Sequence, residues 1–212
     1  MVLHIWGFNE VNNLSIGTAT NQLAPTLVQN IISNPLFSNF VKIACNMTTI
    51  VAITSTNQIF TWGTNASCCG TGDWSSSAIS YARNITTVGS FNGATIVDII
   101  CAGSFTLALD STWALHGFGS GPMGGMTTAS FGNYFNGALT IPCLINAIQA
   151  NSFGQAYSSL YGKTIVKAGC CSSSAFAIDS TGGLHSWGTN SNGKLFDGST
   201  TDQNVPIIAG NF

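Results

Sequence analysis

Three copies of one sequence unit follow one another along the chain, and this internal repetition constrains the fold more than any other feature. The copies run from Lys42 to Gly63, from Asp98 to Gly119 and from Lys167 to Gly188, and they align without a gap. Each carries a cysteine near its start, an alanine in its middle and an aromatic residue followed by glycine at its end. Units repeated roughly fifty to seventy residues apart are typical of folds in which each repeat buries its apolar face against its neighbours.

A half unit precedes the three copies. Trp6–Val28 matches Trp187–Ile208, with a leucine, a glycine and a proline at corresponding places. We therefore expect a single repeat domain over residues 1–212. Its parts are a half unit at 1–28 and whole units at about 40–90, 96–145 and 164–212.

Each unit is predicted to form β-strands. Thr49–Ile53 and Ser174–Ile178 are short apolar runs bounded by turn residues, and Gln58–Trp62 is rich in β-forming residues and ends at a glycine. Sustained helical periodicity is missing; the one apolar stretch of suitable length, Leu27–Leu36, is interrupted by Pro35. About four strands per unit indicate an all-β propeller, with about three and a half four-stranded blades in this chain.

The order of features in each unit resembles the repeat of the RCC1 (regulator of chromosome condensation) family. A cysteine is followed by an apolar-Ala-apolar run, a turn, a Trp-Gly-x-Asn turn, and then Leu, Gly and Pro. Trp62–Asn65 and Trp187–Asn190 are close to the family's Trp-Gly-x-Asn turn. The resemblance covers nearly the whole chain and implies a β-propeller, commonly of seven blades.

Two departures from the family pattern accompany this resemblance. The family usually has a glycine after the cysteine and a histidine three residues further on. Here the two places are occupied by Asn46, Ala102 and Cys171, and by Thr49, Phe105 and Ser174. The chain is also too short for a closed ring of seven blades, so the ring is incomplete unless another chain or an assembly completes it. A two-chain ring, an open head-to-tail assembly and a longer parent chain are three alternatives.

The composition excludes several classes of function. Only 6% of the residues are charged, where about 25% is usual, and the net charge is −2. Five scattered cations cannot form the basic surface that nucleic-acid binding requires. No apolar run approaches the ~18 residues that indicate a membrane span. With 45% hydrophobic residues, the chain is also not expected to be disordered.

Residues that could support catalysis have structural explanations. His4, His116 and His185 all stand two residues before the repeat's aromatic residue, which indicates a recurring structural role rather than a metal site. Asp110 and Asp179 directly precede predicted hairpin turns, where aspartate bonds the turn backbone. Sequence motifs of metalloproteases, serine hydrolases and phosphate-binding loops are missing. We predict no enzymatic activity, no metal and no cofactor.

The seven cysteines divide into two groups. Cys45, Cys101 and Cys170 share one repeat position and are expected to pack as small apolar residues beside buried strands. The others lie in or near predicted loops and are the candidates for disulfide bonds: Cys68, Cys69, Cys143 and Cys171.

Four Asn-x-Ser/Thr sequons bear on the compartment. They begin at Asn13, Asn46, Asn65 and Asn84. All except Asn46, which adjoins a predicted buried cysteine, fall in predicted loops where a glycan could stand. Together with the scarcity of charge, they favour a secreted or cell-surface glycoprotein; a cytoplasmic protein is the alternative.

These observations favour a non-enzymatic propeller that acts as a structural or assembly unit outside the cell, of a kind that can form filaments. Its partner would then be another copy of the chain. The first alternative is a propeller that binds a different protein, as an inhibitor or scaffold, through aromatic anchors. The candidate anchors are Trp74, Trp113, Tyr134 and Phe135. The second alternative, implied only by the family resemblance, is guanine-nucleotide exchange on a small GTPase.

Overall fold

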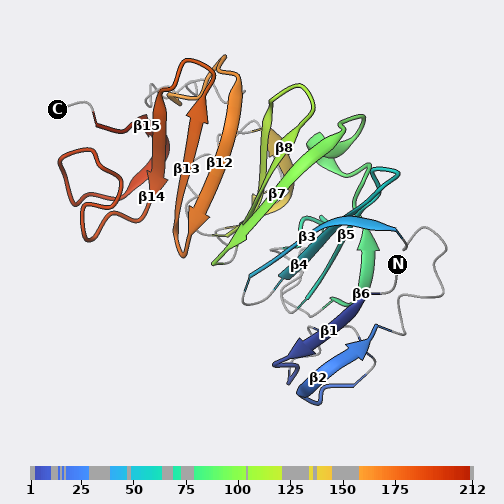
Figure 1. Ribbon diagram of the computed structural model, residues 1–212. Helices are drawn as coiled ribbons and strands as arrows, with labels where there is room; N and C mark the ends of the chain where they lie inside the picture. The colour runs from blue at the N-terminus through green and yellow to red at the C-terminus, as the bar shows by residue number, and fades with distance from the viewer. Residues whose placement is uncertain are drawn as a thin grey trace.

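The regular secondary structure in the described part of the chain consists of β-strands, arranged in four antiparallel sheets, and one short 3-10 turn. The computed structural model describes residues 3–10, 14, 16, 18–28, 39–46, 49–63, 69–72, 79–103, 105–120, 134–135, 138–144 and 158–210. The sheets follow one another in chain order along an open arc, with the N-terminal hairpin at one end and the C-terminal sheet at the other (Figure 1).

We call the four sheets half blade A and blades B, C and D. Half blade A consists of β1 (His4–Gly7) and β2 (Gln22–Leu27). Blade B consists of β3 (Phe40–Cys45), β4 (Thr49–Thr54), β5 (Ile59–Gly63) and β6 (Ile79–Asn84). Blade C consists of β7 (Ile96–Ala102), β8 (Phe105–Asp110), β9 (Leu115–Ser120), β11 (Ala138–Leu144) and the short β10 (Tyr134–Phe135), preceded by the 3-10 turn η3 (Gly89–Phe91). Blade D consists of β12 (Ile165–Cys171), β13 (Ser174–Asp179), β14 (Leu184–Gly188) and β15 (Gln203–Ile208).

The strand registers show that the repeat positions are structurally equivalent. Cys45, Cys101 and Cys170 all lie near the end of the first strand of their blades. Their partners across the sheet are likewise equivalent repeat positions: Ile50, Thr106 and Ala175. The sequence repeat is therefore a repeat of blades.

The glycine after the repeat's aromatic residue has a conformational reason. Gly7, Gly63 and Gly188 have φ values of +113°, +138° and +106°. At these three glycines the pairing between the third and fourth strands shifts register. A residue with a Cβ atom rarely adopts such φ values, so a glycine is needed at this bulge.

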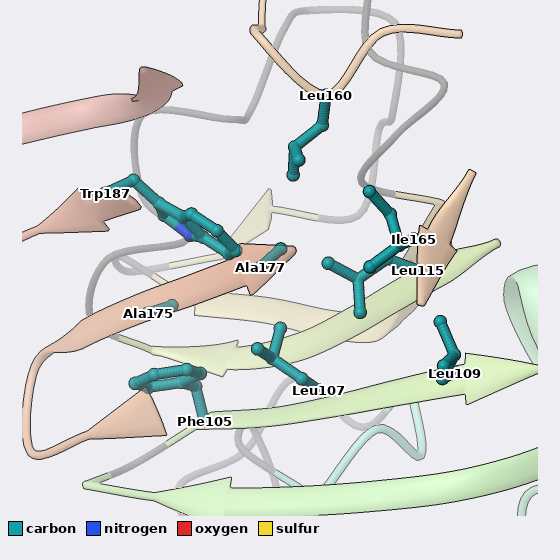
Figure 2. Packing of buried hydrophobic residues seen from close by; sticks show 9 residues of the cluster. All are labelled: Phe105, Leu107, Leu109, Leu115, Leu160, Ile165, Ala175, Ala177 and Trp187. Carbon is teal, nitrogen blue, oxygen red and sulfur yellow. The ribbon is translucent and has the colours of Figure 1, made fainter. Parts of the chain in front are cut away.

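Apolar side chains fill the spaces between successive sheets. Figure 2 shows the cluster between blades C and D, in which Leu107 lies across from Ala177, and Leu109 lies on the side of Leu115 and Ile165. Two similar clusters lie between half blade A and blade B and between blades B and C. Burying one large apolar side chain contributes about 1.5–3 kcal/mol, so these clusters hold the arc together.

The half blade supplies the outer two strands of a blade. Its Asn9 Oδ1 accepts a hydrogen bond from the backbone N–H of Leu14 at 2.8 Å, as Asn190 Oδ1 does from Leu195 at 2.9 Å in blade D. β1 and β2 thus correspond to β14 and β15, the third and fourth strands. Two copies would both supply this same outer half, so joining them would not give seven whole blades.

Candidate interaction surfaces

Two buried networks connect hairpin turns to histidine side chains. Asp110 Oδ1 accepts hydrogen bonds from the backbone N–H groups of Thr112 and Ala114 at 2.8 and 3.0 Å. Asp110 Oδ2 accepts one from His116 Nε2 at 3.0 Å, and His116 Nδ1 lies 2.8 Å from the hydroxyl of Ser90 in η3. This network therefore joins the turn between β8 and β9 to η3, the segment that leads into blade C.

Blade D repeats this arrangement. Asp179 Oδ1 accepts from the backbone of Thr181 and Gly183, and Oδ2 lies 3.2 Å from His185 Nε2. His185 Nδ1 lies 2.7 Å from the hydroxyl of Ser159. Although Ser, His and Asp are the side chains of a hydrolytic triad, here the carboxylate organises a turn and both imidazoles are buried. Recurrence at equivalent places in two blades supports the structural role expected for these aspartates and histidines.

The protonation states of the first network follow from its surroundings. Burial lowers the pKa of His116, and its hydrogen bond to Asp110 only partly opposes this. Burial alone would raise the pKa of Asp110, but the bonds from Thr112, His116 and Ala114 outweigh it, so its pKa lies below the ordinary value. A carboxylate only accepts hydrogen bonds, so Nε2 of the neutral ring carries the proton and Nδ1 accepts from Ser90.

The packing role predicted for the repeated cysteines is wrong for Cys45, whose side chain is exposed in the first strand of blade B. The other two, Cys101 and Cys170, are partly buried and have pKa values far above the ordinary value for a thiol. Burial raises the pKa of Cys101 to about 12, with a smaller opposing effect from its contact with Thr106. Burial likewise raises the pKa of Cys170 to about 12. These thiols stay protonated at neutral pH, as expected for residues that serve in packing.

The raised pKa values of Cys101 and Cys170 predict that both thiols are alkylated slowly. At pH 8 we expect iodoacetamide to modify Cys101 and Cys170 in the folded protein at least about a hundredfold more slowly than in the urea-unfolded chain, because the thiolate is the reactive form. The exposed Cys171 is the internal control and should be labelled at a similar rate in both states. Peptide mass mapping at several times gives the rates. Equal rates for Cys101 and Cys171 in the folded protein would contradict the prediction.

The structure describes only some of the predicted disulfide and glycan residues. Cys171 is an exposed free thiol, and Cys69 is buried with its sulfur 3.7 Å from Thr49 Oγ1. Asn84 is exposed at the end of β6, whereas Asn46 is half-buried and its Oδ1 accepts from the Thr49 backbone at 2.7 Å. The remaining candidates lie outside the described residues or have no described side chain: Asn13, Asn65, Cys68 and Cys143.

Among the predicted aromatic anchors, only Trp113 has a described side chain. It is 46% exposed and has a φ of +66° in the turn between β8 and β9. The same turn position holds Asn57 in blade B and Gly182 in blade D, residue types that adopt positive φ at lower cost. Tyr134 and Phe135 form β10, while Trp74 lies outside the described residues.

The outer face of blade D is an apolar surface that sequence reasoning did not identify. Ile178 and Leu184 are 37% and 38% exposed, and they line a hollow of about 200 Å³ together with Phe176. The equivalent residues of blade C, Leu107, Leu109 and Leu115, are at most 4% exposed because blade D covers them. In blade B the same positions hold Val51, Ile53 and Ile59, which blade C covers.

An ion pair accompanies the contact between blades B and C. Lys42 of β3 pairs with Asp98 of β7, and the two residues occupy the same repeat position in successive blades. Lys167 occupies that position in blade D and borders the open hollow. The face of blade D thus has both the apolar residues and the charged position of a blade-to-blade contact.

A groove at the other end of the arc is the second open surface. It has a volume of about 440 Å³ and lies between β1 and the first strands of blade B. Trp6, Phe8 and Ile43 are among its lining residues. Trp6 is 61% exposed, although its repeat equivalents Trp62 and Trp187 are fully buried.

Comparisons with known proteins agree with this architecture. No family model matches the chain. Human HERC2, an E3 ubiquitin-protein ligase, is 24% identical over 208 residues, which cover 97% of this chain and 4% of HERC2. Human RCC2 is 24% identical over 212 residues, covering 96% of this chain and 39% of RCC2. The solved structure of Prp20p from Saccharomyces cerevisiae, also described as yeast RCC1, has a TM-score of 0.74 at 17% identity and covers 97% of this chain.

The chain is built of RCC1-like β-propeller blades. The predicted fold class is therefore confirmed. These RCC1-like blades span less than half of each compared protein: 4% of HERC2, 39% of RCC2 and 45% of Prp20p. Prp20p is described as binding Gsp1p and histones and has been solved bound to Kap60.

Two other classes of site are a membrane span and a metal centre. The described residues include no helix that is long and apolar enough to cross a membrane. They also include no group of three or more His, Cys, Asp or Glu side chains arranged to hold a metal ion. The open faces at the two ends of the arc are the candidate functional surfaces, because both expose large apolar side chains next to a hollow.

Proposed function

We propose that this chain is a non-enzymatic assembly unit that binds protein through the open face of blade D. The observation that carries the proposal is the exposure of Ile178 and Leu184, whose equivalents in the preceding blades are buried under a neighbouring blade. Removing apolar surface from water contributes about 25 cal/mol per Å², so a partner that covers Ile178 and Leu184 forms a more stable complex.

The proposed partner is a second copy in head-to-tail orientation. The face of blade B is covered in part by Phe118, and that of blade C by Trp187. Trp6 occupies the same repeat position in half blade A and is exposed. Half blade A of one copy could therefore cover blade D of another, which gives a heterologous contact that extends into a chain of copies unless it closes.

A different protein is the alternative partner. Prp20p, which has a similar fold, is described as binding Gsp1p and histones, so partners other than a second copy fit this architecture. Secretion and N-glycosylation are separate proposals. Their support is the exposed sequon at Asn84 and a surface with few charges. Peptide mass mapping of the natural protein tests glycosylation, because an attached glycan adds to the mass of the peptide that contains Asn84.

A complementation experiment tests the head-to-tail contact. We expect wild-type protein to associate with rising concentration in sedimentation velocity, and the variants Trp6→Ala and Ile178→Glu each to weaken association at least about tenfold. A mixture of the two variants should form dimers, because one retains an intact blade D and the other an intact half blade A. Longer assemblies should not form in this mixture.

Val166→Glu is the matched control for this experiment. Val166 is 43% exposed in blade D, but its equivalents Val41 and Val97 are exposed as well, so no neighbouring blade covers this position. We expect Val166→Glu to associate like the wild type. A wild-type protein that stays monomeric at every concentration would show that self-assembly is wrong and would leave a different protein as the partner.

A further inference from the structure

Two exposed Asn-Gly pairs lie in turns of the described chain. Asn92-Gly93 follows η3 at the entrance to blade C, and Asn192-Gly193 lies in the loop between β14 and β15. Both asparagines are exposed, and the two glycines have positive φ values of +81° and +68°. A third pair, at 136–137, lies outside the described residues. The two described pairs are therefore the same dipeptide in two different folded surroundings.

The backbone N–H of the glycine is hydrogen-bonded in one of these two pairs. Gly193 donates to the carbonyl of Asn190 at 2.9 Å, whereas Gly93 donates to no group of the described residues. A Cβ atom placed on Gly93 would meet no atom within 4 Å, whereas one placed on Gly193 would lie 3.6 Å from the carbonyl oxygen of Ser199. The Gly93 peptide therefore has an N–H without a hydrogen bond to the described residues and open space beside it.

We propose that Asn92 is a site of spontaneous deamidation and isomerisation in the folded protein. The Gly93 nitrogen attacks Cγ of the Asn92 side chain. A bond forms between these two atoms, the bond from Cγ to the side-chain nitrogen breaks, and ammonia leaves with the proton from Gly93. Water then adds to either carbonyl carbon of the succinimide ring and opens it, which yields aspartate or isoaspartate. Asparagine is a thermolabile residue type, and a following glycine has no side chain to hinder the attack.

Ring closure requires the peptide after the asparagine to rotate. Asn92 has a ψ of 113°, which holds the Gly93 nitrogen away from Cγ. Rotation there breaks no hydrogen bond of the Gly93 N–H to the described residues, but the same rotation at Asn192 must first break the bond from Gly193 to Asn190. The free energy of one such bond is expected to slow the reaction about fivefold. Folding should therefore favour reaction at Asn92.

Isoaspartate at this place would change the contact between blades B and C. It adds one methylene group to the backbone of the turn, next to Phe91, which is fully buried between these blades. Ser90 in the same turn lies in hydrogen-bond contact with His116 of blade C. The carbonyl of Ala94 accepts a hydrogen bond from the Asn57 side chain of blade B. A longer backbone cannot keep all three anchors in place, so we expect this contact to loosen.

Peptide mass mapping of aged protein tests the site. The wild-type chain is aged at pH 8 in buffer and, in parallel, in urea, and deamidation at Asn92 and Asn192 is followed over time. We expect the ratio of the two rates, Asn92 over Asn192, to be at least about fivefold higher in the folded protein than in urea. The ratio in urea is the control for the neighbouring sequence, because neither turn is folded there. Electron-transfer fragmentation separates isoaspartate from aspartate.

Two variants test the effect on the contact between blades. Asn92→Gln should stay intact during ageing, because its longer side chain closes the corresponding ring far more slowly. Freshly prepared Asn92→Asp carries the charge of the product without the added methylene. The backbone N–H of Ile96 donates to Asn57 Oδ1 at 3.0 Å, so its hydrogen exchange reports on this contact. We expect protection at Ile96 to fall in aged wild type in proportion to its isoaspartate content, and to be kept in both variants.

The two readouts can each overturn one part of the proposal. A rate ratio that is equal or lower in the folded protein would show that folding does not favour reaction at Asn92. Full protection of Ile96 in protein that carries isoaspartate at position 92 would show that the contact between blades B and C tolerates the longer backbone. A raised ratio together with a loss of protection confined to aged wild type supports the proposal.

Discussion

Replacing Trp187 with alanine is expected to lower the free energy of unfolding by about 3–5 kcal/mol. The indole is fully buried between blades C and D, where it lies among Leu107, Ala175 and Ala177 (Figure 2). Its removal leaves a cavity that close-packed neighbours fill only in part. The expected loss is large compared with the total stability of about 5–15 kcal/mol of a typical domain.

Trp6→Ala is the matched control, because Trp6 occupies the same repeat position in half blade A. It is 61% exposed, so we expect a change within about 0.5 kcal/mol when the protein is dilute and monomeric. Urea unfolding followed by circular dichroism gives both values. Trp187→Phe provides an intermediate that folds more readily, since Phe118 occupies this position in blade C.

A loss of several kcal/mol in Trp6→Ala would contradict the open arc. It would mean that Trp6 is covered in the isolated chain, so that half blade A is not an uncovered end. A small loss in Trp187→Ala would contradict the packing between blades C and D.

The repeats made the fold predictable from the sequence. Alanine and cysteine at fixed positions mark the inner strands, and the aromatic-glycine pair marks the bulge between the third and fourth strands. Because every whole unit has the same pattern, agreement among copies compensates for the weak signal of each strand. The half unit was predicted in the same way, from the match between Trp6–Val28 and Trp187–Ile208.

The open surfaces were harder to predict, because equivalent residues differ only in their neighbours. Ile53, Leu109 and Ile178 are all apolar in the sequence, yet only Ile178 is exposed. The neighbouring sequence does not distinguish Ile178 from Ile53 and Leu109. Ile178 is exposed because blade D lies at the end of the arc. A signal was nevertheless present, since an apolar residue at this position in every unit indicates a face that requires a covering blade.

The histidine networks were predicted only in part. Recurrence indicated a structural role for His116 and His185, and the turn role of Asp110 and Asp179 followed from their place before a hairpin. The bond between each pair could not be inferred, because it depends on two neighbouring strands that place the side chains on one face of the sheet. The serine partners lie in connecting segments whose paths the sequence does not specify.

Acidification is expected to destabilise the chain in two steps. The pKa of His116 is lowered in the folded state, so as pH falls below about 6.5 the unfolded chain binds a proton that the folded chain does not. This contribution is fully present above pH 6.5 and is lost at no more than about 1.4 kcal/mol per pH unit. The second step begins near pH 4, because the pKa values of Asp110 and Asp179 are lowered in the folded state.

The double variant Asp110→Thr with His116→Phe tests the first step. It reproduces the pair Thr54 and Phe60, which blade B holds at the same two positions. We expect the free energy of unfolding of the wild type to fall more steeply between pH 7 and pH 5 than that of the variant, as measured by urea unfolding at each pH. Equal slopes would show that His116 titrates alike in both states. Because Thr54 and Phe60 cannot titrate in this range, blade B should keep its protection from hydrogen exchange at pH 5 better than blade C does.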